Sequence, residues 1–126
     1  MKGVLVDTSV WFDHFRHRHD ALVELLERDL VMVHPLVLGE IACGSPPNRD
    51  QMLSDLDRLQ TTQQATVQET MVFIGRERLF GLGCGLIDML LLASTLITPG
   101  TELWTLDKRL CVLAERFGVM YQPFLH

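Results

Sequence analysis

Two aspartates directly follow short apolar stretches that are typical of buried strands. Asp7 ends the run Gly3-Val4-Leu5-Val6-Asp7, and Asp107 follows the stretch 102–106. Functional sites in open α/β sheets form at the carboxyl ends of the strands, so both carboxylates are expected at one edge of the sheet. Asp is also a favoured N-cap, and each aspartate precedes a predicted helix. Helix capping is therefore the alternative role for both residues.

Two further acids lie inside apolar segments. Asp88 is the one charged residue between Gly85 and Ile97, and an unpaired carboxylate buried there would cost several kcal/mol. The structural alternative places Asp88 in the first turn of a helix, where the helix dipole favours an anion. Glu40 lies in the apolar stretch 35–42. Taken alone, Glu40 fits a solvated helix position better than a ligand position.

Together, the four acids predict a metal site. Clustered carboxylates repel one another unless bound cations offset their charge. Their oxygens are hard ligands that select Mg²⁺ or Mn²⁺ over zinc. Such an ion bridges carboxylates and a substrate phosphate, lowers the pKa of a bound water and neutralises the leaving oxygen. Phosphodiester hydrolysis with one or two ions is the expected chemistry.

Alternating strands and helices are expected to position these acids. The pattern predicts strands at 3–6, 30–33, 102–106 and 119–121, and helices after Thr8-Ser9 and over 19–29, 35–44, 50–59, 66–80, 86–97 and 108–117. Thr8 and Ser9 are expected as N-caps, and Pro35 takes the favoured first position of its helix. The alternation predicts a single domain with a parallel sheet and helices on both faces.

The composition fits one folded intracellular domain. The chain has 126 residues, of which 48% are hydrophobic and 21% are charged, enough for one core but not for two. Its cysteines are scattered without a Cys-x-x-Cys pair, which suits a reducing compartment. There is no secretory h-region before Asp7, and the apolar run 89–97 is too short to span a bilayer. A soluble cytoplasmic protein is expected.

The net charge of −5 is unfavourable for a nucleic-acid partner, since phosphate binding relies on clustered Lys and Arg. A carboxylate metal site contributes negative charge that bound cations offset. Local basic patches could also bind phosphates, and the candidate residues are Arg16, Arg18, Arg76, Arg78, Lys108 and Arg109.

Other reactive arrangements are poorly supported. The chain has no Gly-rich phosphate loop, and its serines lack the context of a nucleophile elbow. His14, His17 and His19 could bind a transition metal, but their place on a polar helix end favours a solvated face.

Four motifs resemble the signature of the PIN-domain family. They are Val6-Asp7-Thr8-Ser9-Val10-Trp11, Glu40-Ile41-Ala42-Cys43-Gly44, Leu86-Ile87-Asp88 and Leu103-Trp104-Thr105-Leu106-Asp107-Lys108. The resemblance covers nearly the whole chain, and the opening Asp-Thr-Ser with the late Trp-Thr-x-Asp is its most specific part. It implies a PIN-like α/β/α sandwich with a central parallel sheet, and one PIN domain over residues 1–126.

The same resemblance implies a function. Small proteins with this pattern are similar to VapC toxins, endoribonucleases that form homodimers and are silenced by a cognate VapB-type antitoxin. Asp7, Glu40, Asp88 and Asp107 are then the quartet that binds Mg²⁺ or Mn²⁺, with Thr105 in the catalytic site and Thr8 as a hydrogen-bonding neighbour. The segment Lys108-Arg109-Leu110 departs from the pattern, because many relatives carry a further acid or aromatic residue there.

An antitoxin of this kind lays a helix over an apolar groove. Trp11, Phe12 and Phe15 are candidates for that groove, and the alternative is that this aromatic stripe belongs to the core.

Two other functions stay open at this point. A catalytically silent PIN-like binding or regulatory module would suit the acidic net charge if its partner were a protein. A metal-dependent phosphatase of the haloacid-dehalogenase type also has an aspartate at a strand end. That chemistry needs a second acid two residues later, where this chain has Ser9.

Overall fold

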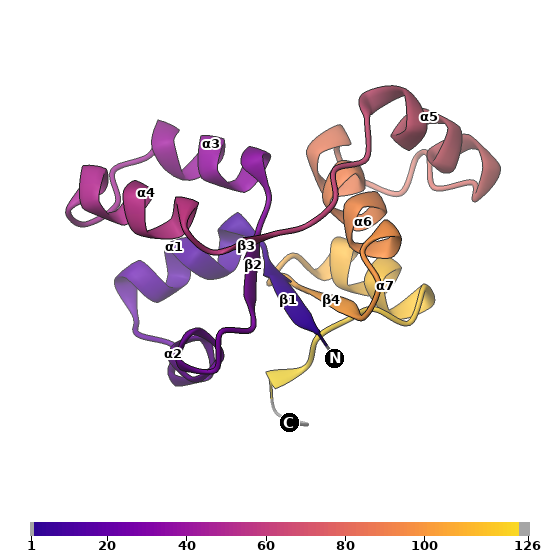
Figure 1. Cartoon of the computed structure of the whole chain (residues 1–126). Helices are drawn as coiled ribbons and strands as arrows, with labels where there is room; N and C mark the ends of the chain where they lie inside the picture. Colours follow the sequence, from indigo (N-terminus) through magenta and orange to yellow (C-terminus); the bar gives the residue numbers. More distant parts are fainter. Residues whose placement is uncertain (1, 124–126) are drawn as a thin grey trace.

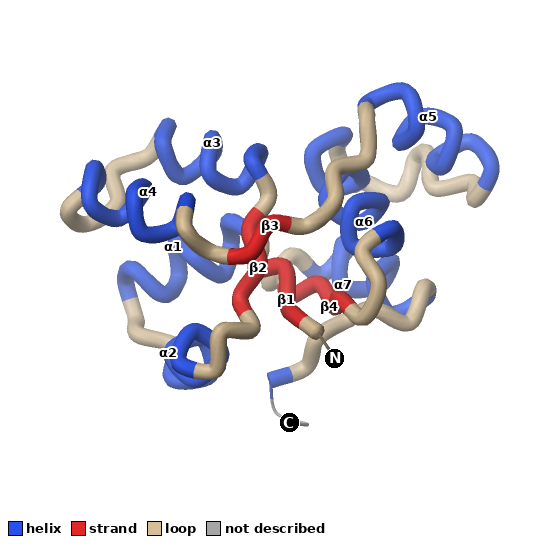
Figure 2. The backbone as a smooth tube through the Cα atoms, in the orientation of Figure 1, coloured by secondary structure: helices blue, strands red, loops and turns tan. Residues whose placement is uncertain are grey.

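The computed structural model describes residues 2–123, and within them four parallel strands form one sheet (Figure 2). The strands are β1 (Gly3–Val6), β2 (Val31–Val33), β3 (Gln60–Thr61) and β4 (Thr101–Trp104), in the spatial order β3-β2-β1-β4. All residues of β1 are buried. β1 pairs with β4 from Gly3 opposite Thr101 to Val6 opposite Trp104. The first and last strands of the described chain are therefore direct neighbours in the sheet.

Helices cover both faces of this sheet (Figure 1). On one side lie α1 (Thr8–Arg16), α2 (Asp20–Glu27), α3 (Pro35–Cys43) and α4 (Arg49–Asp57), and on the other lie α5 (Val67–Arg76), α6 (Leu86–Ile97) and α7 (Lys108–Arg116). This arrangement confirms the predicted α/β/α sandwich. Among residues 2–123, none of the helices combines the length and apolar character needed to cross a bilayer.

The core lies where the helices pack on the sheet. β1 and β4 contribute Leu5 and Leu103, and α6 contributes Leu91 and Leu92, all fully buried. α6 is buried from Met89 through Thr95, as its apolar composition predicts. Trp11 is 2% exposed, so the core interpretation of this aromatic residue is correct.

Phe12 and Phe15 are partly buried and pack against the core, with their ring centroids 5.9 Å apart. The aromatic stripe of α1 therefore supports the core along its whole length.

Helix α5 begins and ends with local signals. At its N-terminus, Thr66 Oγ1 accepts from the backbone N–H of Glu69, and Glu69 Oε1 accepts from the backbone N–H of Thr66, which is a capping box. The predicted continuation to Phe80 is wrong, because the helix ends at Arg76 in a Schellman motif. Arg78 adopts a φ of 56°, and the Leu79 N–H donates to the carbonyl of Ile74.

Three other predictions about the elements need correction. The short strand β3 was not anticipated, because Gln60 and Thr61 are polar and exposed. The predicted strand at 119–121 is reduced to an isolated bridge between Leu103 and Met120, since Pro123 cannot donate to a ladder. Helix α1 is preceded by Asp7 as its N-cap, so Thr8 and Ser9 are helical residues and not caps.

Candidate active site

Asp7 is fixed by the pairing of β1 with β4. Its backbone N–H donates to the carbonyl of Trp104 at 2.9 Å, which continues the sheet one residue past β1. The side chain is 6% exposed, and its Oδ2 accepts from the hydroxyls of Ser9 at 2.6 Å and Thr105 at 2.8 Å. Asp7 makes no side-chain cap on α1. Capping therefore does not explain this carboxylate.

The same two hydroxyls hold the loop between β4 and α7. Ser9 Oγ accepts from the backbone N–H of Leu106 at 3.1 Å, and Thr105 Oγ1 accepts from the backbone N–H of Asp107 at 3.1 Å. The position of Asp107 is thus tied to that of Asp7. We call this group of Asp7, Ser9, Thr105 and the two backbone N–H donors the hydroxyl clasp.

Thr105, which the resemblance implies as a residue of the catalytic site, donates its hydroxyl to Asp7. The contact of Ser9 with Asp7 was not predicted, and Ser9 is not the predicted helix cap. A signal was available, because side chains in the first turn of a helix point back toward its N-terminus. A serine two residues after Asp7 is therefore well placed to reach the Asp7 carboxylate.

The other three acids are each held through one oxygen. Asp107 Oδ1 caps α7 by accepting from the backbone N–H groups of Arg109 at 2.9 Å and Leu110 at 3.0 Å. Asp88 Oδ2 accepts from the backbone N–H of Gly85 at 3.3 Å. Asp107 therefore caps α7 and Asp88 lies in the first turn of α6, as the structural alternatives predict. Each role uses only one of the two carboxylate oxygens.

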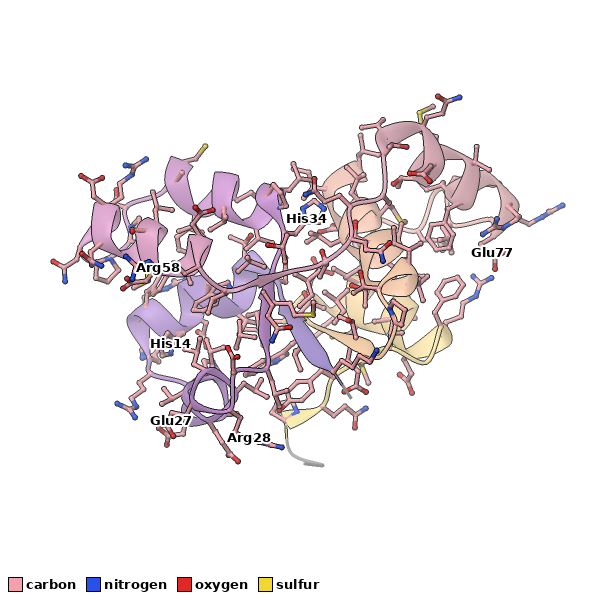
Figure 3. All side chains as sticks on the ribbon, viewed as in Figure 1. His14, Glu27, Arg28, His34, Arg58 and Glu77 are labelled. Atoms are coloured by element: carbon pink, nitrogen blue, oxygen red, sulfur yellow. The ribbon has the colours of Figure 1, made fainter. Side chains whose placement is uncertain are left out.

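Glu40 is held from a different helix. The Thr8 hydroxyl donates to Glu40 Oε1 at 2.8 Å, which links the first turn of α1 to α3. His34 supports this arrangement, because its Nδ1 accepts from the backbone N–H of Leu36 and caps the N-terminus of α3. Burial lowers the pKa of His34. Figure 3 shows His34 between α3 and α6.

The four carboxylates share one electrostatic environment. Burial is the main reason why the pKa of Asp88 is raised, and the negative charges of Asp7, Asp107 and Glu40 raise it further. The hydrogen bond from the Gly85 N–H acts in the opposite direction. Within residues 2–123, the second oxygen of each of these four carboxylates accepts no hydrogen bond. One edge of the sheet therefore presents anchored carboxylates with a free oxygen each.

Residues 4–116 match the PIN domain family. The chain belongs to the PIN-domain family. Two curated relatives, both named Ribonuclease VapC32, come from Mycobacterium tuberculosis strains CDC 1551 / Oshkosh and ATCC 25618 / H37Rv. Each is 44% identical to this PIN domain over 116 residues, which cover 92% of this chain and 94% of the relative.

The donor set of this PIN domain fits a hydrated hard cation. Within the described range 2–123, no three His, Cys, Asp or Glu side chains form a compact cluster that could hold an ion directly. Mg²⁺ does not need such a cluster, because it keeps several waters and is bound through one or two carboxylates plus substrate phosphates. Oxygen atoms held from one side and free on the other match that requirement.

His14 and His19 of this PIN domain connect two helices. His19 pairs through Nε2 with Asp13 Oδ2, and its backbone N–H donates to Nδ1 of His14 at 3.0 Å. The hydrogen bond from His19 is the main reason why the pKa of Asp13 is lowered. These contacts join the end of α1 to the start of α2. The predicted solvated face therefore holds for exposed His17, whereas His14 and His19 are partly buried and paired.

Proposed function

We propose that this PIN domain is a metal-dependent endoribonuclease, the toxin of a VapBC-type toxin–antitoxin pair. The observation that carries the proposal is the set of four carboxylates at the carboxyl edge of the sheet, each anchored through one oxygen. The name ribonuclease of both relatives, at 44% identity over 92% of this chain, supports RNA as the substrate. A VapB-type antitoxin is the partner that the same relationship supports.

The residues divide into ligands and supports. Asp7, Glu40, Asp88 and Asp107 would hold Mg²⁺, or Mn²⁺ as a substitute, with Asp7 and Asp107 from the loops that follow β1 and β4. When bound, the ion supplies positive charge at the scissile phosphate and favours ionisation of the attacking water. Ser9 and Thr105 keep Asp7 oriented through its Oδ2, and Thr8 does the same for Glu40. The hydroxyls therefore preorganise the carboxylates before substrate binds.

Position 9 argues against the phosphatase alternative. That mechanism needs an acid two residues after the nucleophilic aspartate, and here Ser9 donates a hydrogen bond to Asp7. The silent-module alternative would be consistent with loss of one or more acids. All four are present, and each is held by a donor of the protein.

The test is cleavage of a panel of structured RNAs by the purified, antitoxin-free protein. We expect cleavage with Mg²⁺ or Mn²⁺, complete loss with EDTA, and recovery when Mg²⁺ is returned in excess. Mg²⁺ should also raise the Tm, because a ligand that binds only the folded state stabilises it by mass action. Cleavage that resists EDTA would contradict the metal mechanism. A folded protein that cleaves no RNA and shows no shift in Tm would favour a binding module.

We also propose that the protein is cytoplasmic and that residues 1–126 form one PIN domain. Cys43, Cys84 and Cys111 are free thiols, which suits a reducing compartment.

Association of two copies is proposed through one face, formed by α5 and the C-terminal half of α6. A groove of about 480 Å³ lies there, lined by Ala65, Gln68, Glu69, Val72, Phe73, Arg76, Ala93, Leu96 and Ile97. The face is apolar and open, since Met71 is 63% and Val72 is 60% exposed. None of the four acids lines the groove, so a dimer formed here leaves the active site accessible.

The occupant that best fits this groove is a second copy of the chain. Glu69 and Arg76 both line it, about two helical turns apart on α5. A two-fold axis that pairs the α5 helices antiparallel brings Glu69 of one copy to Arg76 of the other. This contact between opposite charges adds to the Arg76–Glu77 ion pair and the Glu69 capping contact within each copy.

Val72→Glu is therefore expected to convert a dimer into a monomer in sedimentation velocity, because it places a charge in the apolar centre of the groove. Val112→Glu on α7 is the matched control, since Val112 is 65% exposed and lies outside the groove. A parent protein that is monomeric at micromolar concentration, or a Val72→Glu protein that stays dimeric, would contradict this interface.

A further inference from the structure

Arg109 occupies a position that its helix does not explain. It is the second residue of α7, where the positive end of the helix dipole disfavours a cation. A cation that the helix disfavours here suggests a function outside the helix.

The side chain of Arg109 is exposed and lies against the loop that leads into α6. Its Nη1 donates to the carbonyl oxygen of Gly83 at 3.4 Å, across the gap between α7 and the loop that leads into α6. Gly83 has a φ of +90°, and a Cβ at this position would lie 2.6 Å from Nη1 and 2.7 Å from Cδ of Arg109. A side chain here would displace the guanidinium from this position, and the positive φ itself favours glycine.

The guanidinium of Arg109 lies near Asp107 and the helix that carries Asp88. The backbone N–H of Arg109 donates to Asp107 Oδ1, and Gly83 is two residues before the N-cap of the helix that carries Asp88. Cys84 reports on the same region. Burial is the main cause of its raised pKa, Asp88 and Asp107 raise it further, and Arg109 lowers it. The guanidinium and two carboxylates of the quartet therefore act on one thiol.

The guanidinium remains available to an anion. Among residues 2–123, no carboxylate oxygen lies within 4.0 Å of an Arg109 nitrogen. Arginine has five N–H donors in a planar fork, and only the contact with Gly83 uses one of them. A planar fork matches the oxygens of a phosphate in a bidentate contact.

We propose that Arg109 binds a backbone phosphate of the RNA strand, adjacent to the phosphate that is cleaved. This assignment rests on the proposed ribonuclease function and deepens it. RNA approaches a chain with a net charge of −5 and an edge lined with carboxylates. A cation at that edge offsets the repulsion and sets which phosphate lies over the metal site.

The test measures binding of a fluorescein-labelled single-stranded RNA across a salt series with Mg²⁺, in an Asp7→Asn background in which cleavage is slow compared with the binding measurement. In Arg109→Gln, we expect the slope of log Kobs against log [salt] to fall by about 0.7, the value for one contact to a single strand. Arg109→Lys should keep the slope and bind more weakly than the parent, because it retains the charge but loses the fork.

Arg58→Gln is the matched control, because it makes the same change in net charge. Arg58 is the exposed C-cap of α4, on the opposite side of the sheet (Figure 3). An unchanged slope in Arg109→Gln, or an equal fall in Arg58→Gln, would overturn the proposal. The slope is independent of turnover. If the slope falls only in Arg109→Gln, but the parent protein with intact Asp7 cleaves no RNA, the phosphate contact is supported and the nuclease proposal fails.

Discussion

Asp88→Asn is expected to reduce RNA cleavage strongly and, at the same time, to raise the Tm of the metal-free protein at neutral pH. The carboxylate of Asp88 is half-buried, and the charges of Asp7, Asp107 and Glu40 act on it. Without a cation, its ionised form is therefore unfavourable in the folded protein. An amide of the same shape can still accept from the Gly85 N–H. The expected gain in stability is about 0.5–2 kcal/mol, and the loss of cleavage is on the order of 10³-fold.

The pH dependence of this gain follows from the direction of the pKa shift. The folded state binds the Asp88 proton more tightly than the unfolded state, whose pKa is close to the ordinary value of 3.8. The resulting stabilisation is fully present below that value and is lost as the pH rises through the raised pKa. The difference in Tm between Asp88→Asn and the parent should therefore grow across this window. Thermal unfolding in EDTA at a series of pH values measures it.

A matched variant separates this effect from a general change in charge. Asp57→Asn removes an exposed carboxylate at the end of α4 and should change the Tm little at any pH. If Asp88→Asn were less stable than the parent at neutral pH, its carboxylate would be a structural cap and not a strained ligand.

Asp7→Asn is expected to reduce cleavage by on the order of 10³-fold while the protein remains folded. The amide oxygen that replaces the carboxylate can still accept from the hydroxyls of Ser9 and Thr105, so the hydroxyl clasp keeps one acceptor and loses the charge that binds the cation. Single-turnover cleavage at saturating RNA, with circular dichroism as the check on folding, measures this effect. Retention of the parental rate would remove Asp7 from the mechanism.

Ser9→Ala provides the graded comparison for Asp7→Asn. It keeps the charge of Asp7 but removes one of the two hydroxyls on Oδ2, and the loss expected for such a supporting residue is about 10–100-fold. Part of this loss should be recovered at high Mg²⁺ concentration, because the ligand is misoriented and not absent. In Asp7→Asn, added Mg²⁺ should recover much less. Equal losses in both variants that respond equally to Mg²⁺ would contradict the division into ligand and support.

The parts of the fold that could be predicted from sequence are those that local patterns determine. Buried β1 and the apolar run of α6 have compositions that fit one environment only, and Asp7 at a strand end follows from sheet topology. β3 could not be predicted, since Gln60 and Thr61 pair with β2 through their backbone alone. The end of α5 was missed because Arg78 takes the left-handed position that glycine usually occupies.

The candidate site also has parts that the sequence predicts and parts that it does not. The acids could be recognised one by one, because a charge in an apolar segment is conspicuous. Their anchoring could not, since the Thr8–Glu40 contact and the Thr105–Asp7 contact span 32 and 98 positions of the chain. The contact between Arg109 and Gly83 is hidden for the same reason. Metal binding by the four acids is a prediction that the EDTA and Mg²⁺ experiments test.

The pairing of β1 with β4 also determines when the enzyme becomes active during its own synthesis. Asp7 leaves the ribosome early, but the strand and the Thr105 hydroxyl that complete its surroundings lie almost a hundred residues later. Contacts between such distant segments form late in folding. A nascent chain that lacks residues 101–107 has neither β4 nor Thr105 and Asp107, so we expect it to be inactive until these residues have been made.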